Sequence, residues 1–257
     1  MSNVPVCGCA TPDMELGVSE KWHARSCAVS ENEYLQMLCD RAEELGRLPP
    51  VVRRPENRVT SITAKRPVLV VGGGASVTWE NTELIRGFRG TIITCEISFR
   101  YLLSLHIIPA YVATLEKAVD EVHLPSDEDI NQCRGRTTVI ASSLTRGNVI
   151  ARLERCNVPV KRYITGVEPR LSNVGLFAVH YAKEVLGADK IILLGFEHER
   201  SRDKFYPPHI FHEWIADFWH FVDQWPDHLI VNCSNGGVLY KDNVLDGEWP
   251  LEVEIDV

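Results

Sequence analysis

The strongest constraint on the fold is a set of short, continuously apolar segments. "PVLVVGG", "GTIITCEI" and "DKIILLGFE" lack the polar alternation of a strand with one face in water. Strands of this kind are buried on both faces, as in parallel sheets whose connections are helices. The sequence therefore predicts an α/β, Rossmann-like fold, with a mostly parallel sheet of about six strands flanked by helices.

The segments between these strands carry helical patterns. The predicted helices are "ENTELIRGF", "SFRYLLSLHI" with Ser98 as its N-cap, "NVGLFAVHYAKEVLGA" and "HEWIADFWHFVDQW". The further strands are "PAYVATLE", "TTVIASS", the shorter "KRYITG", and "HLIVNCS".

Residues 1–60 differ from the rest of the chain. "SENEYLQMLCDRAEELG" predicts a helix that begins at a capping box of Ser30 and Glu33 and ends at Gly46. "GRLPPVVRRPENRV" is rich in Pro and Arg and is typical of a linker or extended arm. We therefore expect a small Cys-containing N-terminal extension over residues 1–60 and a Rossmann-type domain over residues 61–257.

Composition limits the classes of function. The net charge of −8 argues against a broad nucleic-acid surface, which needs clustered Lys and Arg. No apolar run approaches the ~18 residues of a membrane span, and the first residues do not resemble a signal peptide. A cytoplasmic protein is therefore expected, in which the eight cysteines are reduced thiols or metal ligands. Cys95 and Cys233 lie in predicted strands and are expected to be buried.

Four candidate soft metal ligands occur in the N-terminal extension. Cys7, Cys9, His23 and Cys27 could form a Cys₃His zinc site, although the CxC spacing is shorter than usual. The alternative is a set of free thiols in a small cap that packs on the main domain.

A glycine-rich turn follows the first apolar strand in "VLVVGGGASVTWENTELIRGF". It matches neither the P-loop motif nor GxGxxG. Backbone N–H groups of Gly73, Gly74 and Ala75, with the hydroxyl of Ser76, could bind an anion at a helix N-terminus. The alternative is an ordinary tight turn that needs glycine.

A second helix start offers the same geometry in "SNVGLFAVHYAKEVLG". Ser172 or Asn173 is its expected cap, and Gly175 allows close approach of a ligand. Ser142 follows another predicted strand. Because ligands bind beyond the carboxyl ends of parallel strands, all these residues are candidates for a nucleotide site.

In combination, these motifs resemble the MptE-like family, which contains the archaeal 6-hydroxymethyl-dihydropterin diphosphokinase and motility-associated glycosyltransferase-like proteins. The resemblance covers roughly residues 66–240 and includes "SNVG…LGADKIILLGFE" and "VNCSNGG". The family typically has Gly-Pro-Ser in the first turn, where this chain has Gly74, Ala75 and Ser76. Glu116 and Glu197 stand where the family has Asp.

The resemblance implies a nucleotide-dependent transferase. In the diphosphokinase version, ATP gives its terminal diphosphate to a substrate hydroxyl, with Mg²⁺ held by Glu116 and Glu197. Glu is one methylene longer than Asp, and Mg²⁺ tolerates little change of geometry. The implied partners are a nucleotide and a small hydroxyl-bearing acceptor, and a homo-oligomer is compatible with the sequence.

Two further functions stay open. In a nucleotide-sugar glycosyltransferase, which would be sialyltransferase-like, a histidine or carboxylate would act as base on the acceptor hydroxyl. The candidate histidines are His198, His209 and His212, for which surface positions in a mobile lid are the alternative. The third function is a non-catalytic binding or assembly protein on the same scaffold.

Overall fold

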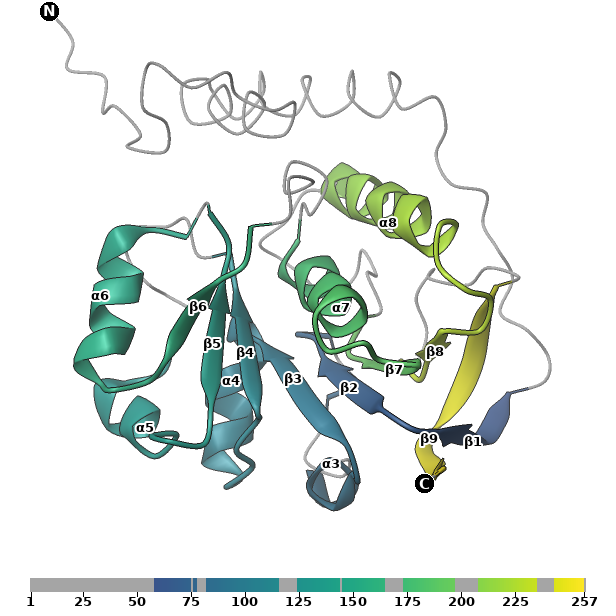
Figure 1. Ribbon diagram of the computed structural model, residues 1–257, viewed down its shortest axis with the longest axis horizontal. Helices are drawn as coiled ribbons and strands as arrows, with labels where there is room; N and C mark the ends of the chain where they lie inside the picture. The colour runs from purple at the N-terminus through teal and green to yellow at the C-terminus, as the bar shows by residue number, and fades with distance from the viewer. Residues whose placement is uncertain are drawn as a thin grey trace, which may run out of the picture.

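A computed structural model describes residues 58–74, 76–77, 82–115, 124–143, 145–164, 173–196, 208–234 and 243–256. These residues form one nine-stranded sheet with helices on both faces (Figure 1). The predicted N-terminal helix over residues 30–46 lies outside the described residues, as do the cysteine–histidine set and the proposed extension up to residue 57.

The predicted α/β class is confirmed, because every pair of neighbouring strands is parallel. The strands are β1 (Val59–Ala64), β2 (Pro67–Val71), β3 (Thr91–Cys95), β4 (Tyr111–Thr114), β5 (Thr138–Ala141), β6 (Val160–Arg162), β7 (Lys190–Leu194), β8 (Ile230–Asn232) and β9 (Val244–Ile255). Their order across the sheet is β1-β9-β8-β7-β2-β3-β4-β5-β6.

The predicted number of about six strands is wrong, because β1 and β9 lack the continuous apolar pattern of the central strands. β9 contains Gly247 and Pro250, which normally interrupt strands. It tolerates them through an irregular pairing, in which Val59 and Ser61 of β1 lie opposite Gly247 and Glu252. β1 itself, "VTSITA", is half polar because alternate side chains are exposed at the sheet edge.

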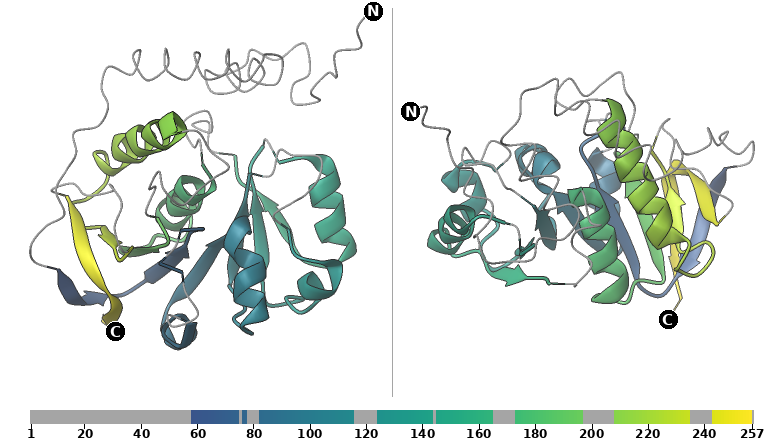
Figure 2. Two further views of the ribbon diagram at one scale, coloured as in Figure 1. Left: turned by 180° about the vertical axis from the view of Figure 1, so that it is seen from behind. Right: turned by 90° about the horizontal axis from the view of Figure 1, so that it is seen from above.

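Helices cover both faces of the sheet (Figures 1 and 2). They are α3 (Thr82–Gly87), α4 (Glu96–Ser104), α5 (Asp127–Asn131), α6 (Gly147–Arg155), α7 (Val174–Glu184) and α8 (Pro208–Val222). Val68 and Val70 of β2 pack in the core that contains α7 and α8, whereas Leu69 and Val71 pack on the opposite side with α3 and α4. Among the described helices, none is both long and apolar enough to cross a membrane.

The N-cap predicted for α4 is wrong. The helix begins at Glu96 with Cys95 as its N-cap residue, and Ser98 lies inside the first turn. The apolar strand therefore passes into the helix without a side chain that caps the helix. The reason lies in the Ser98 hydroxyl, which is buried and donates a hydrogen bond to the Gly72 carbonyl of the neighbouring turn.

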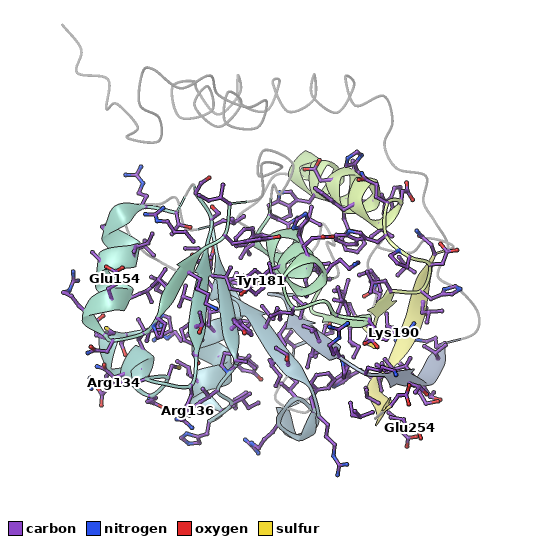
Figure 3. The ribbon with its side chains drawn as sticks, viewed as in Figure 1. Arg134, Arg136, Glu154, Tyr181, Lys190 and Glu254 are labelled. Atoms are coloured by element: carbon purple, nitrogen blue, oxygen red, sulfur yellow. The ribbon has the colours of Figure 1, made fainter. Side chains whose placement is uncertain are left out.

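An aromatic cluster holds α7 against β6 and α8. Tyr163 follows β6, and its hydroxyl lies 3.0 Å from Nδ1 of His180 on α7. The ring of Tyr163 also meets that of Tyr181 edge to face at 5.0 Å, and Figure 3 shows Tyr181 on the sheet side of α7. Burial lowers the pKa of His180, so the ring is a neutral part of the core. This packing fixes α7 across the centre of the sheet.

A carboxylate fixes the start of β2 beside β7. The two oxygens of Asp189 accept hydrogen bonds from the backbone N–H groups of Lys65 and Arg66, each at 2.8 Å. Burial acts to raise the pKa of Asp189, but these hydrogen bonds outweigh it and hold that pKa below its usual value. Asp189 immediately precedes β7, so the contact aligns the amino ends of both central strands.

We expect Asp189→Asn to lower the free energy of unfolding by about 1 kcal/mol at neutral pH, because an amide oxygen can replace only one of the two accepting oxygens. A folded-state pKa below the unfolded value stabilises the protein above the unfolded pKa, and this contribution is lost as pH falls through the folded pKa. The difference between wild type and variant should therefore shrink as the pH falls below the ordinary pKa of an aspartate, about 3.9. Urea denaturation at several pH values measures it. Asp227→Asn, at an exposed turn, is the control, and an equal loss in both variants would contradict the role of Asp189.

Candidate functional site

The candidate site lies where the strand order changes direction. From β2 the chain adds β3, β4, β5 and β6 on one side, and then returns through α7 to place β7, β8 and β9 on the other side. β2 and β7 are therefore neighbours whose following segments diverge. In open parallel sheets, ligands bind at this switch point, beyond the carboxyl ends of the strands.

Hydrogen bonds tie the two segments together at this point. The Gly72 N–H donates to the Leu194 carbonyl at 2.8 Å, and the Gly74 N–H donates to the Gly195 carbonyl at 2.9 Å. The Gly195 N–H in turn donates to the buried hydroxyl oxygen of Ser76 at 3.0 Å. Gly195 has a φ of 81°, a conformation that side chains rarely adopt. The glycine turn is thus a rigid continuation of the β2–β7 pair.

Phe196 fills the space between three segments. A Cβ atom on Gly72 would lie 3.0 Å from its ring, and one on Gly175 would lie 2.6 Å from it. The Phe196 N–H donates to the hydroxyl oxygen of Ser234, beyond β8, at 2.8 Å. The buried ring therefore sets the spacing between the turn after β2 and the first turn of α7.

The predicted cap of α7 is confirmed at Asn173. Its side-chain oxygen accepts a hydrogen bond from the Leu176 N–H at 2.8 Å. Gly175 is needed here for contact with Phe196, which is a packing requirement and differs from the ligand approach expected from the sequence. The amino end of α7 nevertheless points its dipole toward the carboxyl edge of the sheet.

The helix α4, which directly follows the neighbouring strand β3, begins with two inward-facing polar residues. Glu96 is only 7% exposed, and its Oε2 accepts a hydrogen bond from the Leu115 N–H at 3.0 Å. Ser98 bonds to the Gly72 carbonyl, as described above. Between them in sequence, Ile97 is 43% exposed and would contact a Cβ on Gly73 at 2.5 Å.

The structure brings some predicted residues together and separates another. Gly73, Gly74 and Ser76 lie at the switch point, and Asn173 and Gly175 reach it through Phe196. Ser142 follows β5, which is three strands from β2 and thus about 14 Å away along the sheet.

Several predicted site residues lie outside the described residues: Ala75, Glu116, Ser172, Glu197 and His198. In the sequence, Glu116 directly follows the described residue Leu115, after β4. Glu197 directly follows the described residue Phe196, after β7. Over the part of the chain that the structure describes, no group of three His, Cys, Asp or Glu residues could hold a metal. The backbone of His209 and His212 belongs to α8, close to where the sequence predicts a helix start.

The buried cysteines are unsuited to nucleophilic chemistry. The expected burial of Cys95 and Cys233 is confirmed. Burial, reinforced by the Glu96 charge, raises the pKa of the Cys95 thiol far above its usual range. Burial likewise raises the pKa of Cys233 to about 12. Both thiols are therefore protonated at neutral pH and act as small apolar side chains.

Several exposed basic residues lie away from this site. Arg134 and Arg136 are exposed beyond α5, and Figure 3 shows both at the periphery of the molecule. The sheet edge at β6 carries the exposed Lys161 and Arg162. These positions fit a solvated surface and do not converge on β2 and β7.

Comparison with solved structures identifies a similar fold. The chain resembles the MAf glycosyltransferase from Magnetospirillum magneticum AMB-1 with a TM-score of 0.51 and 16% identity, over 87% of this chain and 40% of that chain. The chain thus spans less than half the length of that glycosyltransferase. A protein from Lactobacillus plantarum aligns over 64% of this chain and 58% of its own, at 14% identity and a TM-score of 0.34. No family model and no curated protein sequence matches the chain.

We expect Gly175→Ala to lower the free energy of unfolding by about 1–3 kcal/mol, because the new methyl group would overlap the Phe196 ring. Thermal and urea unfolding measure the change. Gly147→Ala in the first turn of α6 is the matched control, because no atom lies within 4 Å of its added Cβ. Alanine there should be neutral or stabilising.

A second variant shows whether Phe196 causes the loss. Phe196→Leu alone should destabilise the protein, but Gly175→Ala should cost less in that background than in wild type, because the smaller side chain leaves room for the methyl group. Additive losses would exclude direct steric contact as the cause.

Proposed function

We propose that this chain is the nucleotide-binding part of a nucleotide-sugar-dependent glycosyltransferase. The observation that carries the proposal is the glycine turn at the β2–β7 switch point, where Gly73 is exposed and Gly74 is half-buried. A turn without side chains lets a phosphate group approach the backbone of Gly73, whereas the N–H groups of Gly72 and Gly74 already donate to the Leu194 and Gly195 carbonyls. The similarity to the MAf glycosyltransferase fold supports this choice over the diphosphokinase function.

The phosphate groups of the donor would lie over the exposed backbone of Gly73, because the buried ring of Phe196 fills the space between the glycine turn and the first turn of α7. The positive end of the α7 dipole favours an anion there. Arg170, close before α7 in sequence, is a candidate to add a charge-assisted hydrogen bond. The donor sugar would then extend toward the carboxyl ends of β4 and β7, where the sequence supplies Glu116, Glu197 and His198.

In the proposed reaction, an oxygen of the acceptor hydroxyl attacks the anomeric carbon of the sugar. The bond between that carbon and the phosphate oxygen breaks, and the nucleotide leaves with the electron pair. A base takes the hydroxyl proton, and Glu116, Glu197 and His198 are the candidates. The glycine turn would stabilise the charge that develops on the departing phosphate.

The diphosphokinase function is the alternative, with ATP as donor and Mg²⁺ bound by Glu116 and Glu197. The non-catalytic scaffold is the third candidate. The three functions differ in what the protein binds, so a nucleotide panel separates them.

We expect CMP, UDP or GDP to raise the melting temperature of the full chain more than ATP does at equal concentration, because the proposed site accepts the nucleotide product of sugar transfer. Thermal-shift measurements with each nucleotide, with and without Mg²⁺, test this. Stabilisation by ATP with Mg²⁺ alone would favour the diphosphokinase. No stabilisation by any nucleotide would leave the non-catalytic scaffold.

The role proposed for Glu116 has its own test. Glu116→Gln keeps the length of the side chain but removes its charge, so any Mg²⁺-dependent part of the nucleotide stabilisation should disappear. Hydrolysis of the matching nucleotide-sugar should fall at least tenfold if Glu116 is the base. Glu154→Gln, on the exposed surface of α6, is the control. An unchanged Mg²⁺ response together with unchanged hydrolysis would remove Glu116 from the site.

A further inference from the structure

An exposed apolar side chain stands directly beside the glycine turn. Ile97 is 43% exposed in the first turn of α4, and its Cγ2 lies 2.5 Å from the position of a Cβ on Gly73. Over the residues that the structure describes, the other large exposed apolar side chains are Ile164, Val185 and Ile255. Among these four, Ile97 is the one that contacts the turn after β2. A molecule bound through its phosphates to that turn would therefore lie close to the exposed side chain of Ile97.

The polar group expected at this place faces inward. In dinucleotide-binding folds, an acidic residue near the end of the second strand binds the ribose hydroxyls. The corresponding residue here is Glu96, directly after β3. Its carboxylate is buried and accepts a hydrogen bond from the Leu115 N–H at 3.0 Å. The residue that faces solvent next to the turn is therefore apolar.

We propose that Ile97 packs against the nucleobase of the bound nucleotide, so that the site takes a nucleoside phosphate with its phosphates on the glycine turn and its base on Ile97. This inference rests on the proposed function. An aliphatic side chain contacts the face of any base without reading its hydrogen-bonding edge. Ile97 thus contributes affinity for the base and leaves the choice between bases to other residues.

The test compares ligands with and without a base. Dissociation constants are measured by calorimetry for CMP, UDP, GDP and ribose 5-phosphate, with wild type and Ile97→Ala. We expect Ile97→Ala to weaken each nucleotide that binds wild type by about tenfold, because roughly two buried methylene equivalents are lost. Binding of ribose 5-phosphate should change by less than about twofold, since it lacks the base.

Two further variants make the result specific. Ile255→Ala removes the same atoms from a side chain that is 37% exposed at the end of β9, and should leave all dissociation constants unchanged. Ile97→Val keeps most of the apolar contact and should restore binding to within about threefold of wild type. Circular dichroism spectra and melting temperatures establish that each variant is folded.

The outcomes separate this inference from the proposed function. If wild type binds a nucleotide and Ile97→Ala binds it equally well, Ile97 does not contact the base. The same conclusion follows if Ile97→Ala weakens the binding of ribose 5-phosphate as much as that of the nucleotide. In both cases the inference is wrong and the proposed function stands. If wild type binds none of CMP, UDP and GDP, the proposed function fails and the inference fails with it.

Discussion

The close approach of the segments after β2 and β7 is the contact on which the rest of the site depends. The Gly72 N–H reaches the Leu194 carbonyl at 2.8 Å, and a Cβ on Gly72 would lie 2.4 Å from the Gly195 carbonyl. Glycine at both positions allows the two backbones to meet, and a φ of 81° at Gly195 turns the chain so that Phe196 can enter beneath α7. The same contact joins β2 and β7 at the centre of the sheet and positions the backbone that follows them at its carboxyl edge.

Polar side chains at this edge mostly complete the fold. Ser76 accepts from the Gly195 N–H, Asn173 caps α7, and Glu96 accepts from the Leu115 N–H. Each would otherwise leave a buried backbone N–H without a partner, at a cost of about 1–3 kcal/mol. The surface that the proposed ligand would meet near the turn is therefore built from glycine backbone and Ile97. Hydrogen-bonding side chains alone give an incomplete description of such a site.

The central strands could be predicted because burial on both faces leaves a continuous apolar pattern. β2, "PVLVV", is buried at every position, and β7 is buried from Ile191 onward. The edge strand β1 and its neighbour β9 are only partly buried, and Gly247 with Pro250 breaks the pattern of β9. Strand order, and with it the switch point, depends on contacts between distant segments that no local pattern encodes. The cap at Asn173 could be predicted from the sequence because a capping side chain bonds within its own helix start. The partner of Ser98 could not, because it is Gly72, in the turn after another strand.

Sugar transfer and diphosphate transfer would both need a phosphate site at this switch point. They differ in the further groups that each reaction requires. In sugar transfer the nucleotide is the leaving group, so charge would develop on the phosphate that we propose to lie at the glycine turn. In diphosphate transfer the β-phosphorus is attacked, and the charge spreads over a longer polyphosphate that needs a metal ion. In the proposed site, the exposed backbone of Gly73 would serve either donor. The distinction would then fall on Glu116 and Glu197, the positions at which the resemblance drawn from the sequence implies aspartate. The longer side chain is less suited to the strict geometry of Mg²⁺, and more compatible with a base that must reach a hydroxyl.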